Sequence, residues 1–257
     1  ADLAVFVVSA ADGVQVQTEA AWRMAAALGL PRMVFVNKLD RERASFDATL
    51  AQLRERLGAG IAPLELPIGE EAAFRGIADL LTDKAHIYEN GVPHTEDIPD
   101  EMEALEHQVR DNLVEGIVVA DDDLVERYLE GEAIGIDELE RTLHDGIAAA
   151  TVFPVVVGSA TAEIGVDRLA DFLVEIGPSP LDRPCTVTAG DAEVEVRADP
   201  SGDPLAFVFK SVADPYVGQI SLFRVLSGTI RTDDHLVNSR SSTDERLHGL
   251  MTVRGKE

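Results

Sequence analysis

The order of apolar and polar positions along the chain predicts strands that alternate with helices in its first part. Residues 3–8 form an apolar run typical of a strand buried on both faces, and residues 32–36 form a second such run. Residues 15–28 and 46–57 instead carry apolar side chains at helical spacing, which predicts two helices. This βαβα order is typical of an α/β domain built on a parallel sheet.

The pattern changes after residues 61–68, which predict one further strand. Three helical patterns rich in acidic side chains follow a turn at Asn90-Gly91. An apolar run at residues 152–157 then resumes the strand pattern, and a last helical pattern comes after it. We therefore expect an acidic helical subdomain, at about residues 77–150, inserted into a domain that covers residues 1–180.

The final third of the chain has the character of a β domain. Residues 178–184 contain three prolines and predict a linker. Short strand patterns between glycine, proline and aspartate turns follow at residues 205–209, 220–225 and 235–238. Residues 185–257 are therefore expected to form an antiparallel β-barrel domain that is incomplete in this sequence.

The bulk composition is that of a globular protein. The 257 residues are 46% hydrophobic with a mean hydropathy of +0.02, and no apolar run is long enough for a membrane span. No basic segment precedes the first apolar run, which argues against a signal peptide. A single cysteine, Cys185, excludes a disulfide within the chain and fits a reducing compartment. A cytoplasmic location is expected.

The net charge of −25 is concentrated in one segment. Residues 77–150 hold 21 of the 47 acidic residues and only four of the 22 basic ones. The excess of negative charge argues against phosphate-led binding of nucleic acid through this segment. Two interpretations remain, namely a docking site for a basic protein partner and a solvated face that keeps the protein soluble.

The first candidate site is Asn37-Lys38-Leu39-Asp40, which directly follows the second apolar run. Open α/β sheets bind their ligands at the carboxyl ends of such strands. The Asp40 carboxylate can accept hydrogen bonds from both the ring N–H and the exocyclic amino group of guanine, a pair that adenine does not offer. The Asn37 amide can meet the other base edge, and the stem of Lys38 can lie along the ring. The motif predicts a guanine site.

The second candidate element is Ser159-Ala160-Thr161, after the apolar run at residues 152–157. Backbone N–H groups of a Ser-Ala pair at a strand end can face a base oxygen. The dipeptide alone is common, and its weight comes from its position after Asp40 and after a second buried strand. The two elements together predict one site for GTP or GDP.

Further segments make the chain resemble the translation elongation factor G family, including its elongation factor G-like members. These segments are residues 11–19 with Trp22, residues 37–41, Pro67-Ile68-Gly69 with Phe74, Gly76 and Asp79-Leu80, residues 214–218, residues 223–229, and residues 244–247 with 254–256. The resemblance extends over nearly the whole chain. It implies a P-loop-GTPase-type parallel sheet followed by a translation-factor β-barrel.

The resemblance also implies a function and its partners. The family consists of translational GTPases that bind the ribosome and use GTP hydrolysis to drive the movement of tRNA and mRNA, with Mg²⁺ at the phosphates. Its inserted subdomain touches the ribosomal stalk, which gives the acidic segment a partner. By the resemblance Asn37, Lys38 and Asp40 read the base, Ser159 and Ala160 contact guanine from the second loop, and Thr161 occupies a position where the family varies.

The phosphate-binding half of such a site is not found in this sequence. No G-x-x-x-x-G-K-[ST] motif occurs, and Gly255-Lys256 has neither the spacing nor the preceding strand of one. No strand followed by the family's Asp-x-x-Gly segment precedes the first apolar run, and the family's switch threonine, which accompanies Mg²⁺, is not found either. We therefore expect an internal fragment of a longer GTPase, one that does not hydrolyse GTP by itself.

Two alternatives stay open from the sequence. One is a non-hydrolysing, ribosome-binding paralogue that kept the fold and lost the phosphate site. The other is a relative of the release-factor or ribosomal-protection type, although the large acidic insert at residues 77–150 fits this type less well.

Overall fold

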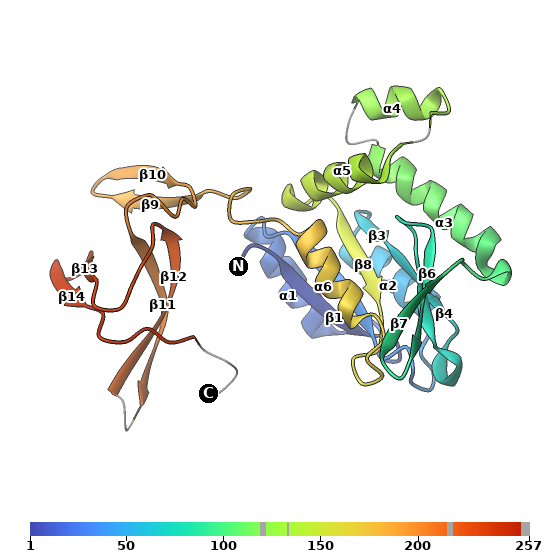
Figure 1. Ribbon diagram of the computed structural model, residues 1–257, viewed down its shortest axis with the longest axis horizontal. Coiled ribbons are helices and arrows are strands. Elements are labelled where there is room, and N and C mark those ends of the chain that lie inside the picture. The colour runs from blue at the N-terminus through green and yellow to red at the C-terminus, as the bar shows by residue number, and fades with distance from the viewer. Residues whose placement is uncertain (119–121, 133, 215–217, 253–257) are drawn as a thin grey trace. The chain divides into compact units, whose positions relative to one another are not determined.

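The computed structural model describes residues 1–118, 122–132, 134–214 and 218–252 in two compact units, Ala1–Ser179 and Pro180–Glu257 (Figure 1). Each unit is considered by itself. Pro215, Tyr216, Val217 and the Gly255-Lys256 pair lie outside the described residues. Among the described helices, none combines the length and the apolar character that crossing a bilayer requires.

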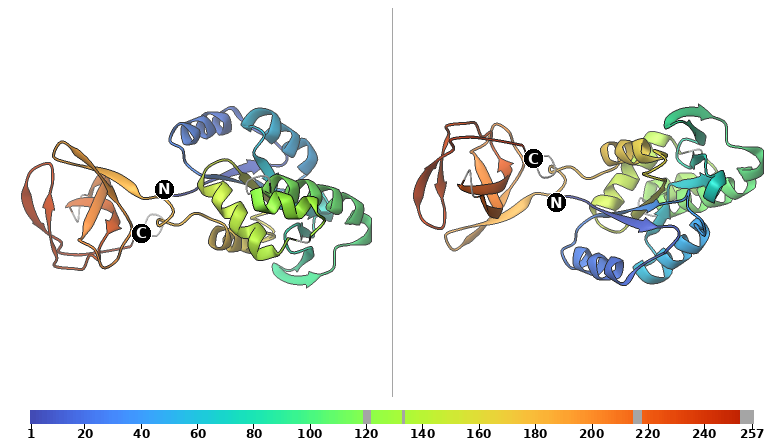
Figure 2. Two further views of the ribbon diagram at one scale, coloured as in Figure 1. Left: turned by 90° about the horizontal axis from the view of Figure 1, so that it is seen from above. Right: turned by 90° about the horizontal axis from the view of Figure 1, so that it is seen from below.

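The first unit is built on a four-stranded parallel sheet. Its strands are β1 (Ala4–Ser9), β2 (Arg32–Asn37), β8 (Phe153–Val157) and β3 (Ile61–Pro63), in the order β1-β2-β8-β3. Helices α1 (Val16–Ala27) and α2 (Phe46–Leu57) lie on one face and α6 (Val166–Glu175) lies on the other (Figure 2). The predicted α/β class and the parallel sheet are confirmed.

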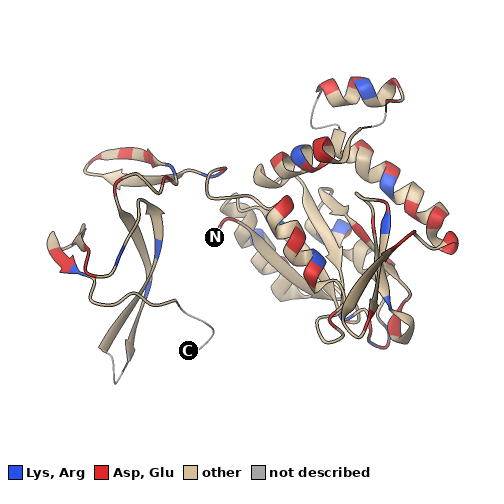
Figure 3. Cartoon of the chain, viewed as in Figure 1, with Lys and Arg blue, Asp and Glu red and all other residues tan. Residues whose placement is uncertain are grey.

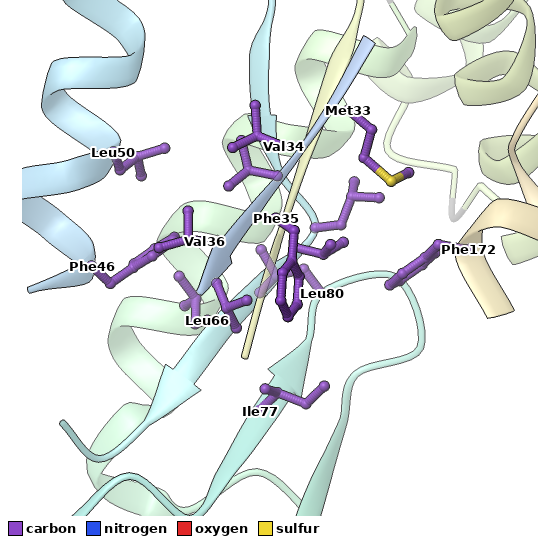
Figure 4. Close-up of a cluster of buried hydrophobic side chains, with 14 of the residues drawn as sticks. Met33, Val34, Phe35, Val36, Phe46, Leu50, Leu66, Ile77, Leu80 and Phe172 are labelled. Carbon is purple, nitrogen blue, oxygen red and sulfur yellow. The ribbon is translucent and has the colours of Figure 1, made fainter. Parts of the chain in front are cut away.

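Side chains of β2 point alternately to the two faces of the sheet, so this strand packs against helices on both sides. Val34 and Val36 point towards Phe46 and Leu50 of α2, and Met33 points towards Phe172 of α6 (Figure 4). All residues from Met33 to Val36 are at most 3% exposed. Side chains of successive strand residues point to opposite faces, so a strand between two helical layers needs apolar residues at every position.

The expectation that residues 3–8 are buried on both faces is wrong. Among the strands that the structure describes, β1 is at the edge of the sheet and has β2 as its one neighbour. Phe6 packs edge-on against Trp22 of α1 with ring centroids 4.9 Å apart, while Val5 and Val7 are 37% and 61% exposed. Within the described residues, α1 covers one face of this strand and the other face stays open.

The strand expected at residues 61–68 is two strands in two different sheets. β3 ends at Pro63, and β4 (Glu65–Ile68) begins an antiparallel sheet with β5 (Gly76–Asp79), β6 (Lys84–Glu89) and β7 (Val92–Glu96). The chain changes sheets at Leu64, whose N–H still bonds to Val155 of β8. The apolar run is continuous because both strands are buried, so it contains no sign of the break.

The turn at Asn90-Gly91 and the three predicted helices are confirmed, but the first part of the range 77–150, which was expected to be helical, forms β5, β6 and β7 of this sheet. Asn90 and Gly91 both have positive φ, which matches the two-residue hairpin turn between β6 and β7. The helices are α3 (Asp100–Val118), α4 (Asp122–Leu129) and α5 (Ile136–Ala148). Leu113, Leu139, Leu143 and Ile147 of α3 and α5 are buried in the core of the first unit.

The second unit contains antiparallel hairpins. They are β9 (Cys185–Ala189) with β10 (Ala192–Val196), β11 (Leu205–Asp214) with β12 (Gly218–Ser227), and β13 (His235–Asn238) with β14 (Thr243–Arg246). The antiparallel pairing was predicted. In the described part of this unit the hairpins are separate two-stranded sheets, and Phe207 and Phe209 are about 60% exposed. Closure into a barrel stays a prediction.

Candidate functional site

The first predicted loop leaves the carboxyl end of β2 with a tightly held backbone. Asn37 is the last residue of the strand, and Lys38 takes a left-handed conformation with φ of 67°. Leu39 is fully buried, its N–H bonds to the carbonyl of Gly158 at 3.4 Å, and its carbonyl accepts the N–H of Glu71 at 3.0 Å. The loop is therefore anchored on both sides of its apolar residue.

The second predicted loop leaves the carboxyl end of β8. Glycine is the residue type that fits at Gly158, since a Cβ atom there would lie 2.4 Å from the Ile164 carbonyl and 2.8 Å from the Phe35 ring. Ser159 is buried and pairs with Ile164 through two backbone hydrogen bonds of 2.9 and 3.0 Å. Its Oγ accepts the N–H of Ala162 and lies 3.3 Å from Thr161 Oγ1.

The structure brings the two loops together. β2 and β8 are adjacent, with Val36 opposite Val157. Asn37 Oδ1 accepts the N–H of Ala160 at 3.0 Å and the N–H of Lys38 at 2.8 Å. This link spans 123 positions of sequence and was not foreseen, because Asn37 was expected to face a base. Since Ala160 N–H already has an acceptor, a base oxygen would compete with Asn37 for it.

The Asp40 carboxylate has hydrogen-bonding capacity that the described part of the chain does not use. Its side chain is 26% exposed, yet Oδ1 is buried and has no hydrogen-bond partner in the described part of the chain. Its other oxygen lies 3.7 Å from Arg41 Nε, which is too far for a hydrogen bond. Buried carboxylate oxygens are nearly always hydrogen-bonded, so an unsatisfied one beside a strand end fits an external donor.

Three other predicted residues, Lys38, Ala160 and Thr161, have exposed side chains on the same two loops. Lys38 is about half exposed, and its Nζ lies 3.9 Å from the Asp12 carboxylate in the turn after β1. Ala160 and Thr161 are exposed at the tip of the second loop. All six predicted residues therefore lie on the two loops at one end of the parallel sheet, where the Asn37–Ala160 bond joins them.

A buried polar cluster lies beneath the second loop. Glu65 Oε2 accepts the N–H of Val157 at 2.9 Å, and Asp79 pairs with Arg168 at 2.8 Å. Burial raises the pKa of the Glu65 carboxyl well above its ordinary value, and the neighbouring Asp79 adds to the effect. Burial, followed by the hydrogen bond to Asp167, likewise raises the pKa of Tyr88.

The sequence patterns did not reveal this cluster. Its members come from β4, β5, β6 and α6, and the Asp79–Arg168 pair joins positions 89 residues apart. An isolated acidic residue in a strand pattern was the only available signal, and this chain has many acidic residues.

The described residues include no group of three or more histidine, cysteine or acidic side chains arranged to hold a metal ion. The two described loops carry one carboxylate, one side-chain amide and one lysine among the predicted residues.

Two known domain families match parts of this chain. The family model for the elongation factor Tu GTP-binding domain matches residues 1–179, and that for elongation factor G domain 2 matches residues 203–257. The first unit is thus a GTP-binding domain of the translation-factor class. The chain belongs to the elongation factor G-like translational GTPases.

Two relatives show the extent of the match. An elongation factor G-like protein of Thermotoga maritima is 39% identical over 243 residues, which is 94% of this chain and 35% of that protein. A crystal structure of a Thermus thermophilus protein is 37% identical, with a TM-score of 0.85, over 100% of this chain and 36% of that one. The chain therefore spans about a third of the length of the relatives it matches.

Proposed function

We propose that this chain supplies the guanine-recognition part of a ribosome-dependent translational GTPase. The observation that carries the proposal is the buried, unpartnered Oδ1 of Asp40 at the carboxyl end of β2. Membership of the family supports it, because the matching domain model is that of a GTP-binding domain. The bound ligand is GTP or GDP, and the whole protein promotes translocation.

In this proposal Asp40 accepts hydrogen bonds from the ring N–H and the exocyclic amino group of guanine. A hydrogen bond to a charged group contributes about 1.5–3 kcal/mol, so losing both would separate guanine from adenine by a large factor. The Lys38 stem covers one side of the ring. Asn37 keeps the second loop against the first through Ala160, and Ser159 fixes the shape of that loop through Ile164.

The phosphate chemistry lies outside these residues. In the family, phosphoryl transfer depends on positioning and charge neutralisation at the phosphates, which Mg²⁺ supplies when bound. The sequence contains no G-x-x-x-x-G-K-[ST] motif, and we expect no GTP hydrolysis by this chain alone.

The domain assignment is also part of the proposal. Residues 1–180 belong to the GTP-binding domain with an acidic insert at about 77–150, residues 178–184 are a linker, and residues 185–257 belong to a translation-factor β-barrel. The family models that match residues 1–179 and 203–257 support this division.

The acidic insert is proposed to contact a basic partner on the ribosome, the stalk protein. Acidic side chains recur along α3 and α5 (Figure 3), and Arg127 of α4 is already paired with Glu132 and Glu138. Binding of this kind should weaken as salt rises, because exposed charges are screened over about 10 Å at 0.1 M salt. Binding that is independent of salt would count against this partner.

A titration followed by amide NMR tests the base specificity. The ¹⁵N-labelled chain is titrated with GDP and, separately, with ADP. GDP should shift the Leu39, Asp40 and Ala160 amides in a saturable way, and ADP at the same concentration should leave them in place. Equal responses to both nucleotides, or GDP shifts confined to other residues, would contradict the proposed site.

A further inference from the structure

Asp40 lies in a loop that is bonded by one acidic residue, Glu71, through both its backbone and its side chain. The N–H of Glu71 donates to the Leu39 carbonyl at 3.0 Å, and Glu71 Oε1 accepts the N–H of Arg43 at 2.7 Å. Glu71 therefore bonds the backbone on both sides of Asp40. We propose that Glu71 is a positioning residue, which fixes the Asp40 carboxylate for guanine recognition.

The backbone around Glu71 is shaped for this contact. Glu71 has φ of 51° and begins the short 3₁₀ helix η1 (Glu71–Ala73). Residues other than glycine seldom adopt a positive φ, and such a backbone conformation persists where surrounding contacts hold it. Gly69 starts the turn with φ of 80°, and a Cβ atom there would lie 2.1 Å from the Ala73 carbonyl.

The same segment also bonds the strand that leads into the second loop. Glu65 of β4 is fully buried, and its Oε2 accepts the N–H of Val157, the residue before Gly158. Residues 65–73 thus contact the first loop through Glu71 and, through Glu65, the end of the strand that leads into the second loop. The strand and turn that open the antiparallel sheet act as a brace under the site.

The inference rests on the guanine site proposed above, and it adds a measurable consequence. A carboxylate that is free to change orientation spends less time in the binding geometry, which lowers the apparent affinity by the fraction of time lost. The loss falls on the bonds that Asp40 makes. Inosine lacks the exocyclic amino group that Asp40 reads, so a misplaced Asp40 should reduce the preference for guanine over hypoxanthine.

Three variants of the 257-residue chain separate this role from a general effect on charge or folding. Glu71→Ala removes the acceptor for Arg43 N–H, and Glu71→Gln keeps an acceptor oxygen without the charge. Glu70→Ala is the matched control, because Glu70 is a carboxylate at the neighbouring position whose side chain makes no hydrogen bond in the described part of the chain. Amide hydrogen exchange at Arg43 reports directly on the bond, with or without nucleotide.

The probes are GDP and inosine diphosphate, titrated by NMR. In Glu71→Ala the Arg43 amide should lose its protection against hydrogen exchange. The affinity for GDP should fall about three- to tenfold, which is the range of one hydrogen bond. The preference for GDP over inosine diphosphate should fall as well. Glu71→Gln and Glu70→Ala should match the wild-type chain.

Results that contradict the role of Glu71 differ from results that contradict the guanine site. Unchanged Arg43 exchange in Glu71→Ala would overturn the brace, whether or not a nucleotide binds. An equal loss of affinity for both nucleotides would make Glu71 merely structural. A wild-type chain that binds GDP and ADP alike would instead defeat the guanine assignment.

Discussion

Asp40 and Asp79 are carboxylates near the ends of buried strands, but their surroundings differ. Asp79 is fully buried and fully used, since Oδ1 accepts the N–H groups of Leu81 and Thr82 and Oδ2 accepts Arg168 at 2.8 Å. Asp40 has a buried oxygen without any partner in the described part of the chain. A saturated buried carboxylate holds the fold together, whereas an unsaturated one at the sheet end leaves capacity for a ligand.

The largest expected effect is the loss of folding stability on substitution of Asp79, the fully hydrogen-bonded carboxylate. Asp79→Asn keeps the side-chain shape but leaves Arg168, which is only 12% exposed, facing an amide instead of a charge. Breaking a buried ion pair from one side costs about 3–5 kcal/mol. Urea unfolding of the first unit, followed by the fluorescence of the single buried Trp22, should show a loss of that size.

Asp171→Asn is the matched control for this change. Asp171 also bonds Arg168, at 2.9 Å, but is 54% exposed, and exposed ion pairs contribute about 0–1 kcal/mol. Similar losses of stability in the two variants would show that burial does not distinguish these carboxylates.

A smaller effect is expected at Glu65, and it depends on pH. An unfolded glutamate ionises near a pH of about 4.3, while burial raises the pKa of Glu65 and so holds its proton to higher pH in the folded chain. The folded state therefore binds more protons, so stability falls as pH rises from about 4.3 through the raised pKa. Asp79, Arg168 and Asp167 are the charged groups that face this carboxyl.

Glu65→Gln removes the titration and keeps an acceptor for Val157 N–H. The stability of the variant relative to the wild-type chain should rise across that pH window, by at most about 1.4 kcal/mol per pH unit for one proton. Urea midpoints at several pH values measure this difference. Parallel pH curves would mean that Glu65 ionises as it does in the unfolded chain.

The continuous apolar runs and the helical spacing of apolar residues predicted most strands and helices of the first unit. The apolar run before Asn37 became β2, and the helical spacing of residues 46–57 became α2 within the same limits. In both elements the apolar residues that form the pattern are buried against neighbouring elements, so the local sequence was sufficient to predict them. The two loops of the candidate site followed from the same patterns, because each begins where a buried strand ends.

Features that depend on distant partners could not be predicted. The change of sheet at Leu64 and the exposure of Val7 are decided by which strand lies alongside, and neither leaves a mark in the local pattern. The Asn37–Ala160 and Glu65–Val157 bonds join residues about 120 and 90 positions apart. In the structure the side-chain oxygen of Asn37 accepts the N–H of Ala160 in the second loop, and its contact with a base stays a prediction.

The most direct test of the guanine site is a change of base preference at Asp40. Asp40→Asn replaces a pure acceptor by a side chain that can also donate, and xanthine has a carbonyl where guanine has its amino group. GDP and xanthosine diphosphate are titrated against both chains by NMR. We expect the wild-type chain to prefer GDP and the variant to prefer xanthosine diphosphate, with each affinity changed about tenfold or more. An unchanged preference for GDP in the variant would contradict base reading by Asp40.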